Sequence, residues 1–494
     1  MKDLMLFSQL YGLKSKYNHK QTSTDGLLGK MESELADLEM MTDEALATKV
    51  YGDNINASTY RSLKSRLKEK MITDLLLGSS NKSKNNIREK QEDVFREYAA
   101  VQIANLNGQA KLKELLATQL VKKSRKYHVT EVTVDTAWIL YLHHLFYDTA
   151  SKRSKNYFEI YEYNSELLAL ERACKRKYAE LSQMLQNQKM DITEVSKTCL
   201  EFFEEYSTAA EQTPSFSLNR MLYLIGCVGY YLIRDYNSMY KLANEALLFL
   251  QTLPFKSLPI EAQFRRYIVR SQLLQGEYAQ GIPILQEIIN TSNKKNTGWF
   301  NSYQLLIQLY MLTNRYKKAV ECLETVQKNK LYKSLPAIFK NDWRILEAYL
   351  NFVQLQNPEL GKPTMSRFRI NKFINNNPEL TESKRMYNIQ LIVAQLLFYF
   401  HDRNYRKIEE RIDAVSKYTS RYLKKDETYR SQVFIKMLAE IPRNNYTRLA
   451  IERHTRKFRK KLSEHPSTMD IGIDNIEIIP YEKLWEMILS KMKR

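Results

Sequence analysis

Basic side chains gather most densely in Arg443–Lys461, near the C-terminal end of the sequence. This segment holds eight basic residues and one acidic residue, Glu452. Four of the basic residues are spaced i, i+3, i+4 and i+7 and would form one stripe along a helix: Arg453, Arg456, Lys457 and Lys460. Because like charges repel one another, this density favours an anionic partner such as nucleic acid, phosphate or an acidic protein surface. The alternative is a solvated helix face in a generally basic protein, with Ile451, Phe458 and Leu462 on its buried side.

A second basic segment lies in Ser58–Leu77, for which the spacing predicts a helix. Its inward apolar stripe is Tyr60, Leu63, Leu67 and Met71. Another face carries the candidate anion-binding residues Arg61, Lys64 and Lys68, flanked by Arg66 and Lys70. Lysine stems often cover apolar surface on ordinary solvated helices, so this face also has a purely structural explanation.

The element at 42–77 loosely resembles a helix-turn-helix. Thr42–Val50 is a predicted short helix, and Tyr51–Ala57 is a turn-rich connector that leads into the basic helix. DNA readers of this kind place the second helix in the major groove and use Arg or Lys on phosphates and guanine edges. The connector exceeds the usual turn of about three or four residues, and no strand pair follows it. DNA binding is therefore the alternative interpretation of this element.

Residues with catalytic or metal-binding chemistry do not form a recognisable motif. The sequence has no phosphate-binding GxxxxGK[ST] loop, no HExxH and no GxSxG pattern. The four cysteines are widely spaced. The adjacent His143 and His144 should point to different faces of a helix, so they cannot chelate one metal as an i,i+4 pair could. We therefore expect a protein that is not an enzyme and that has no cofactor or metal site.

The composition indicates long helices. The chain has 494 residues with only 13 Gly and 11 Pro, and its 76 Lys+Arg against 56 Asp+Glu give a net charge of +20. Gly and Pro usually make up about 7% and 5% of a protein. Since few turn-forming residues over such a length mean few turns, the sequence predicts an all-α fold rather than a sandwich, barrel or alternating α/β fold.

An internal repeat organises the middle of the chain. In Trp299–Leu331, one apolar helical stripe is followed by the polar turn Asn314–Tyr316 and by a second stripe that begins at Ala319. This unit resembles a tetratricopeptide repeat, in which two antiparallel helices approach closest at a small residue early in the second helix. The half-motif recurs at Tyr236, Tyr278 and Tyr405, so the tyrosine intervals are 42, 38 and 89. The last interval accommodates two degenerate units. The resemblance runs from Leu218 to about Leu438 and implies an α-solenoid of antiparallel helix pairs.

Three regions follow from these patterns. They are an N-terminal helical region at 1–125, a tetratricopeptide-like helical-repeat body at 126–445, and a basic helix with a C-terminal capping helix at 446–494. Polar joints are expected at Gly78–Lys84, Thr291–Gly298 and Ser463–Asp474. After Pro480, Tyr481–Met492 is the predicted final helix, and its apolar face would close the open end of the solenoid.

The compartment is expected to be the cytoplasm. The N-terminus lacks the apolar stretch and cleavage site of a signal peptide. The most apolar run, Met221–Ile233, has 13 residues, short of the about 20 that a membrane span needs. The cysteine spacing indicates buried thiols rather than a disulfide framework.

The sequence is also similar to uncharacterised cytoplasmic bacterial helical-repeat proteins, particularly at Phe368–Asn377, Tyr418–Glu440 and Ile476–Trp485. Helical repeats of this sort serve mainly as scaffolds whose concave face holds a peptide, helix or domain. The resemblance therefore implies a non-enzymatic scaffold or adaptor for a protein or peptide partner. The alternative is a nucleic-acid-associated regulator that uses the basic N-terminal and C-terminal helices.

Overall fold

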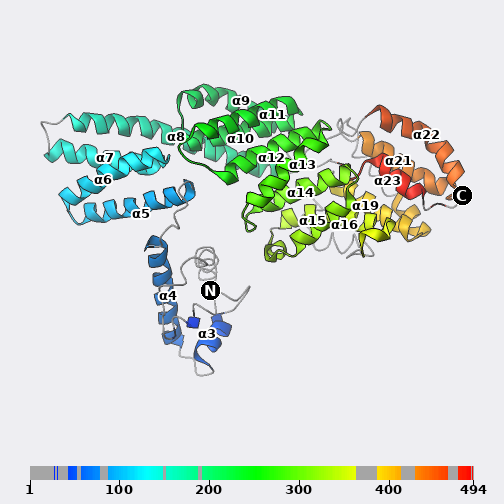
Figure 1. Ribbon diagram of the computed structural model, residues 1–494, viewed down its shortest axis with the longest axis horizontal. Coiled ribbons are helices and arrows are strands. Elements are labelled where there is room, and N and C mark those ends of the chain that lie inside the picture. The colour runs from blue at the N-terminus through cyan, green and yellow to red at the C-terminus, as the bar shows by residue number, and fades with distance from the viewer. Residues whose placement is uncertain are drawn as a thin grey trace. The chain divides into compact units, whose positions relative to one another are not determined.

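The computed structural model describes residues 43–52, 57–77, 87–147, 152–186, 192–335, 337–362, 387–412, 429–465 and 477–490, together with Leu27, Lys30, Met31 and Met492. Within these ranges the chain forms helices and no strand, which confirms the predicted all-α class (Figure 1). The chain divides into two compact units, Met1–Leu167 and Leu168–Arg494. The three regions proposed from the sequence stay a prediction.

The first unit contains two separate hydrophobic cores. Its helices are α3 (Asp43–Tyr51), α4 (Ala57–Leu77), α5 (Ile87–Leu106), α6 (Ala110–Lys126), α7 (Thr130–Tyr147) and the first part of α8 (Arg153–Gln186). One core joins α3 to α4, and the other joins α5, α6 and α7 to the start of α8. The helices expected at Thr42–Val50 and Ser58–Leu77 are thus confirmed to within one residue.

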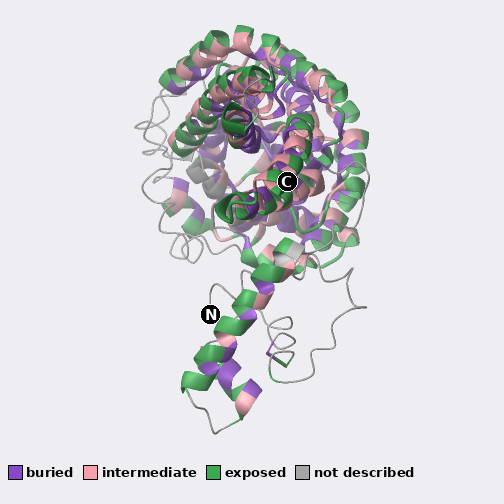
Figure 2. Cartoon of the chain, turned by 90° about the vertical axis from the view of Figure 1, so that its left-hand side faces the viewer, coloured by how far each residue is buried: buried purple, intermediate pink, exposed green. Residues whose placement is uncertain are grey.

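The second unit is an α-solenoid in which consecutive helices pack against each other. It continues from α8 through α9 (Ile192–Gln212), α10 (Phe216–Leu232), α11 (Tyr236–Thr252), α12 (Leu258–Leu274), α13 (Tyr278–Thr291), α14 (Thr297–Leu312), α15 (Tyr316–Gln327), α16 (Ala337–Gln356), α19 (Tyr387–His401), a helical stretch at 405–412, α21 (Tyr429–Arg443), α22 (Arg448–Glu464) and α23 (Tyr481–Leu489). Two short 3₁₀ helices are η2 (Lys330–Ser334) and η3 (Pro358–Leu360). One hydrophobic core runs from Leu181 to Leu489, and Figure 2 shows the buried residues on the helix faces that meet other helices.

First helices of successive pairs contact each other in two places. α12 contacts α14 directly, although α13 lies between them in the sequence. α16 likewise contacts α19, although η3 lies between them in the sequence. Helix pairs that stack with a constant rotation bring one helix of each pair together on the inside of the curve. We call α10, α12, α14, α16 and α19 the inner row.

The turn before each second helix has one repeated geometry. The helices begin at the four tyrosines that the sequence singled out, Tyr236, Tyr278, Tyr316 and Tyr405, which confirms that prediction. Two residues before each tyrosine the backbone is left-handed, with φ of 65° at Arg234, 84° at Gly276, 57° at Asn314 and 52° at Arg403. The amide of the next residue then donates to the carbonyl five residues earlier, as from Arg315 to Tyr310 at 2.8 Å. This hydrogen bond satisfies a helix-end carbonyl and reverses the chain.

Small residues lie where paired helices approach closely. Ala319 is fully buried on α15, as expected for the small position of the repeat. On α13, a Cβ placed on Gly281 would stand 2.7 Å from the Val269 side chain, so that position requires glycine. Met239 takes the corresponding place on α11 and is also fully buried.

The final helix, α23, ends three residues earlier than predicted but buries the predicted apolar face: Leu484, Trp485, Ile488 and Leu489. It contacts α22 and α19. The helix therefore covers the last helix pair and also lies against an inner-row helix of an earlier pair.

Some predictions fall outside the described residues. They include the joint at Gly78–Lys84, the resemblance at Phe368–Asn377 and much of the joint at Ser463–Asp474. The joint at Thr291–Gly298 corresponds to the loop between α13 and α14. Among the described helices, none combines the length and the apolar character needed to cross a membrane.

Candidate anionic-partner site

The basic segment near the C-terminus is divided between two helices. The sequence treated Arg443–Lys461 as one helical element, but α21 ends at Arg443 and α22 begins at Arg448. The break is caused by two consecutive left-handed residues, Asn445 at φ 50° and Tyr446 at φ 58°. The apolar side of α22 holds Ile451, Thr455 and Leu462, each fully buried, and α22 packs on α21. Its basic side chains are therefore directed outward.

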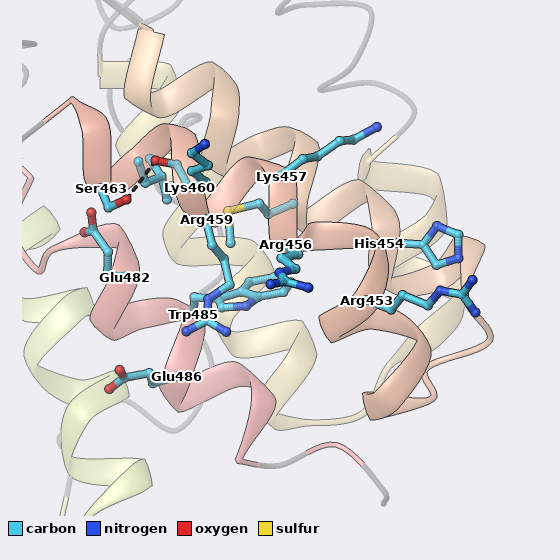
Figure 3. A pocket seen from close by; sticks show the side chains of 12 residues that line it. Arg453, His454, Arg456, Lys457, Arg459, Lys460, Ser463, Glu482, Trp485 and Glu486 are labelled. Atoms are coloured by element: carbon cyan, nitrogen blue, oxygen red, sulfur yellow. Dashed lines mark hydrogen bonds between the residues drawn. The ribbon is translucent and has the colours of Figure 1, made fainter.

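The four predicted residues of α22 lie together at a pocket between α22 and α23. The pocket has a volume of about 850 Å³ and is lined by Met437, Arg453, His454, Arg456, Lys457, Arg459, Lys460, Leu462, Ser463, Glu482, Trp485 and Glu486 (Figure 3). Arg453, Arg456, Lys457 and Lys460 are all exposed. Arg459 belongs to the basic segment expected from the sequence but was left out of the stripe, and His454 was not singled out. Arg459 lies three residues after Arg456, so helical spacing from Arg456 could have identified it.

The pocket has an aromatic side chain at its base. Figure 3 shows Arg456 and Arg459 reaching from α22 toward Trp485 of α23. Trp485 is 1% exposed, and its indole Nε1 is buried with no hydrogen-bond partner among the described residues. A buried indole N–H usually finds an acceptor, and none of the described residues supplies one here.

Positive charge at the pocket is only partly neutralised. Lys460 forms an ion pair with Glu464 at 3.7 Å, and Lys457 lies over the Phe458 ring at 5.0 Å. Arg453, Arg456 and Arg459 have no carboxylate within ion-pair distance in the described parts of the chain.

The neighbouring basic residues outside the pocket are paired. Arg443 binds Glu440 at 3.0 Å and Arg448 binds Glu452 at 2.9 Å. The uncompensated guanidinium groups of α22 are therefore those at the pocket.

The α23 side of the pocket carries two carboxylates. Glu482 accepts hydrogen bonds from Nη2 of Arg430 at 2.9 and 2.8 Å. Glu486 accepts one from Lys483 at 3.0 Å. The site thus presents cations on one wall and anions, each held by its own partner, on the other.

The second group of predicted residues lies on α4. The apolar stripe of Tyr60, Leu63, Leu67 and Met71 is buried, as predicted. Arg61, Arg66 and Lys68 are exposed. Lys64 is instead part of the fold, because its Nζ binds Asp43 of α3 at 2.8 Å.

The Lys64 ion pair also affects Asp43. Partial burial opposes ionisation of this carboxyl, but hydrogen bonds from Lys64 and Tyr60 outweigh it and lower the pKa of Asp43. Both donors lie on α4, so Asp43 fastens α3 to α4. α4 belongs to the first unit and α22 to the second, so these two basic groups are separate candidates.

The histidine pair does not behave as the sequence suggested. His143 and His144 were expected to point to different faces, yet both Nε2 atoms approach Glu114, at 3.3 and 3.7 Å. Adjacent helix positions diverge at the backbone, but the long rings lean toward the same carboxylate on α6. In the part of the chain that the structure describes, no three His, Cys, Asp or Glu side chains are grouped as metal ligands.

The cysteines are thiols in the helix core. Burial raises the pKa of Cys174 to about 11 and of Cys199 and Cys322 to about 12. Burial also raises the pKa of Cys227 strongly. Because the thiolate is the nucleophilic form, a raised pKa makes these thiols less nucleophilic at neutral pH.

Comparison with known proteins gives no match to a family model, to a characterised protein or to a solved structure. The site is therefore interpreted from its own geometry.

Proposed function

We propose that this protein is a non-enzymatic helical-repeat scaffold that binds an acidic segment of a protein partner in the pocket between α22 and α23. The observation that carries the proposal is that Arg453, Arg456 and Arg459 line one pocket without a carboxylate partner among the described residues, and that two of them, Arg456 and Arg459, reach toward Trp485 (Figure 3). Arginine and tryptophan are the residues that most often dominate the energy of protein interfaces. A carboxylate of the segment would pair with the guanidinium groups.

The mixed charge of the pocket favours a protein segment over nucleic acid. Glu482 and Glu486 form part of the lining, and they would repel a phosphate backbone laid across the pocket. A peptide can place acidic side chains toward α22 and neutral or basic ones toward α23. Such complementarity contributes specificity as well as affinity.

We place the helix pairs in the tetratricopeptide-like class and the protein in a reducing cytoplasm. Support for the first comes from the shared turn before the tyrosines and from Ala319 at the small position. Support for the second comes from four cysteines that are all free thiols.

Direct binding of an acidic peptide tests the proposal. The probe is a fluorescein-labelled peptide of alternating Glu and Leu, titrated by anisotropy in about 150 mM salt, where long-range attraction to a charge of +20 is screened. The test variant replaces Arg453, Arg456 and Arg459 by Gln. We expect at least about a tenfold loss of affinity, since each hydrogen bond to a charged group contributes about 1.5–3 kcal/mol.

The matched control replaces Arg443, Arg448 and Lys461 by Gln. It removes the same formal charge from the same segment, at residues that do not line the pocket. Equal losses in both variants would mean that only net charge matters, and the pocket proposal would then be wrong.

The second candidate function is a nucleic-acid-associated regulator. The same unpaired arginines of α22 favour it, together with the exposed Arg61, Arg66 and Lys68 on α4. Its signature is the salt dependence of DNA binding, for which the Discussion gives the expected result.

A further inference from the structure

A group of half-buried arginines lies on the inner row, away from the α22–α23 pocket. Arg266 and Arg270 are one turn apart on α12, and Arg220 is on α10. We call these three residues the inner arginine cluster. None of them has a carboxylate within ion-pair distance in the described residues.

Arg266 extends from α12 to the next inner helix. Its Nη1 approaches the carbonyl of Gly298 and the hydroxyl of Ser302, both at 3.5 Å, which is the long limit for a hydrogen bond. A Cβ on residue 298 would stand 3.3 Å from the same nitrogen, so glycine leaves room for the guanidinium. Burial lowers the pKa of Arg266 to about 10, and the group is still charged at neutral pH.

The other two arginines share these surroundings. The Arg270 guanidinium lies 5.4 Å from the centre of the Tyr231 ring. The Nε of Arg220 is buried without a hydrogen-bond partner in the described chain, and burial lowers the pKa of this arginine. Tyr231 belongs to α10, the helix that also carries Arg220.

Other arginines of the same unit have carboxylate partners. Arg265, next to Arg266, binds Glu287 through both terminal nitrogens. Arg430, which is 1% exposed, is bound by two carboxylates. Removing a cation from water without giving it a partner costs several kcal/mol. Among the described residues the inner arginine cluster has no carboxylate to offset this cost, and Arg266 has only its two long contacts with Gly298 and Ser302.

Polar side chains continue the cluster along α14. Gln304 and Gln308 precede Tyr316 by 12 and 8 residues, and Arg266 and Arg270 precede Tyr278 by the same numbers of residues. The two glutamines and the two arginines therefore occupy matching positions on neighbouring inner helices. The Oε1 of Gln308 is buried with no hydrogen-bond partner among the described residues. This atom accepts hydrogen bonds only, and a peptide N–H is a suitable donor.

We propose that the inner arginine cluster binds the carboxylates of an acidic peptide segment, whose backbone donates to Gln308. The inference rests on the proposed scaffold function and assigns a second, more buried contact for the partner. The half-buried guanidinium groups supply the affinity, because screening by salt is weaker there than at the exposed pocket. The unpaired acceptor on α14 makes an extended peptide a better occupant than an isolated small anion.

Two properties measured on the full chain test this site. The variant Arg266→Gln/Arg270→Gln is compared with Arg265→Gln, which alters the neighbouring, paired arginine. With fluorescein-labelled octaglutamate at about 150 mM salt, we expect the double variant to lose at least about tenfold in affinity. The Arg265 variant should stay within about twofold, as expected for a charge outside the contact. The melting temperature of the double variant should equal or exceed that of the wild type, because an uncompensated charge is removed.

Unchanged binding in the double variant would overturn the site, and so would a lower melting temperature, which would show that the arginines stabilise the fold. The pocket variant at Arg453, Arg456 and Arg459, tested with the same peptide, separates this inference from the proposed function. A loss only in the inner variant supports the inner site and opposes the pocket. A loss only in the pocket variant does the reverse. Inorganic phosphate can also be used to displace the bound peptide. If the same phosphate concentration displaces it from the inner variant and from the pocket variant, that result would also count against the inner site.

Discussion

Arg430 on α21 binds Glu477, which precedes α23, inside the protein core. The arginine Nε lies 2.6 Å from Oε1 of Glu477, and the two side chains are 1% and 5% exposed. The same guanidinium also donates to Glu482 and to the carbonyls of Leu462 and His465. One side chain thus connects α21 to the end of α22 and to the start of α23. It thereby fixes the two helices that form the candidate pocket.

The Arg430 connection predicts a large loss of stability in Arg430→Met. Glu477 would remain buried without its cation, which costs about 3–5 kcal/mol when one partner of a buried pair is removed. Urea unfolding followed by circular dichroism measures the effect. The matched control is Arg443→Met, an exposed pair on the same helix, which should change stability by less than about 1 kcal/mol.

Adding Glu477→Gln to Arg430→Met should restore part of the lost stability, since the orphaned charge is removed. A double variant as unstable as the sum of the two single variants would show that the residues act independently.

The repeated turn predicts that Arg403→Gly stabilises the protein. Arg403 has φ 52°, whereas the equivalent residue of an earlier repeat is Gly276 at φ 84°. A left-handed conformation costs a residue with a Cβ about 1–2 kcal/mol, and glycine avoids it at the expense of a more flexible unfolded chain. We expect a net gain of about 1 kcal/mol, measured by thermal unfolding. The reverse change, Gly276→Ala, should destabilise; if both variants melt at the wild-type temperature, the turn geometry has no energetic importance.

The first turn of α11 gives a prediction about pH. Asp235 accepts hydrogen bonds from the Ser238 hydroxyl at 2.6 Å and the Ser238 amide at 2.9 Å. The Ser238 side-chain bond and then the backbone bond lower the pKa of Asp235 below its ordinary value of 3.8. A carboxyl with a lower pKa in the folded state adds stability above the unfolded pKa, and this stability disappears as the pH falls through the folded pKa.

Asp235→Ala should therefore lower the free energy of unfolding by about 1 kcal/mol at pH 7. The difference from wild type should shrink as the pH falls below about 4. Denaturant unfolding at pH 7 and at several lower pH values measures the free energy of unfolding of the wild type and of the variant. Asp235→Asn, which keeps an acceptor at the helix start, should lose less at pH 7, and its difference from the wild type should shrink over the same pH range because the titrating carboxyl belongs to the wild type. A constant difference between Asp235→Ala and wild type at every pH would exclude an ionised cap.

The sequence was most informative where the determinants are local. The four tyrosines marked helix starts correctly because the turn before each one depends on residues within about six positions, the span of its closing hydrogen bond. The break between α21 and α22 was missed, since Asn445 and Tyr446 are neither glycine nor proline and give little warning of two left-handed residues.

Contacts between distant segments could not be predicted. Arg430 and Glu477 are 47 residues apart, and no periodicity states that they meet. Arg265 and Arg266 are adjacent and equally basic in the sequence, yet one is paired with Glu287 and the other is half-buried without a carboxylate partner in the described part of the chain. Which face of α23 meets α22 depends on packing of the whole second unit. The pocket therefore became visible only in the structure, although four of its basic residues were identified beforehand.

The alternative of nucleic-acid binding makes a quantitative prediction for α22. Each phosphate neutralised on duplex DNA contributes about −0.9 to the slope of log K against log salt. If the stripe of Arg453, Arg456, Lys457 and Lys460 met a phosphate backbone, replacing all four by Gln would flatten the slope by several units. The fold should survive, because all four side chains are exposed.

We expect the slopes of the wild type and the four-residue Gln variant to be nearly equal, with weak binding of duplex DNA and of RNA in both. Lys460 is already paired with Glu464, and Glu482 and Glu486 in the pocket lining oppose a phosphate backbone. The only attraction to DNA or RNA that we then expect is the weak one shown by any protein with a net charge of +20. An anisotropy titration of a labelled duplex over a range of salt measures both slopes, and Arg61→Gln/Arg66→Gln tests α4 in the same way. A clearly steeper wild-type slope, with tight binding that persists above about 150 mM salt, would replace the scaffold proposal with a nucleic-acid-binding function.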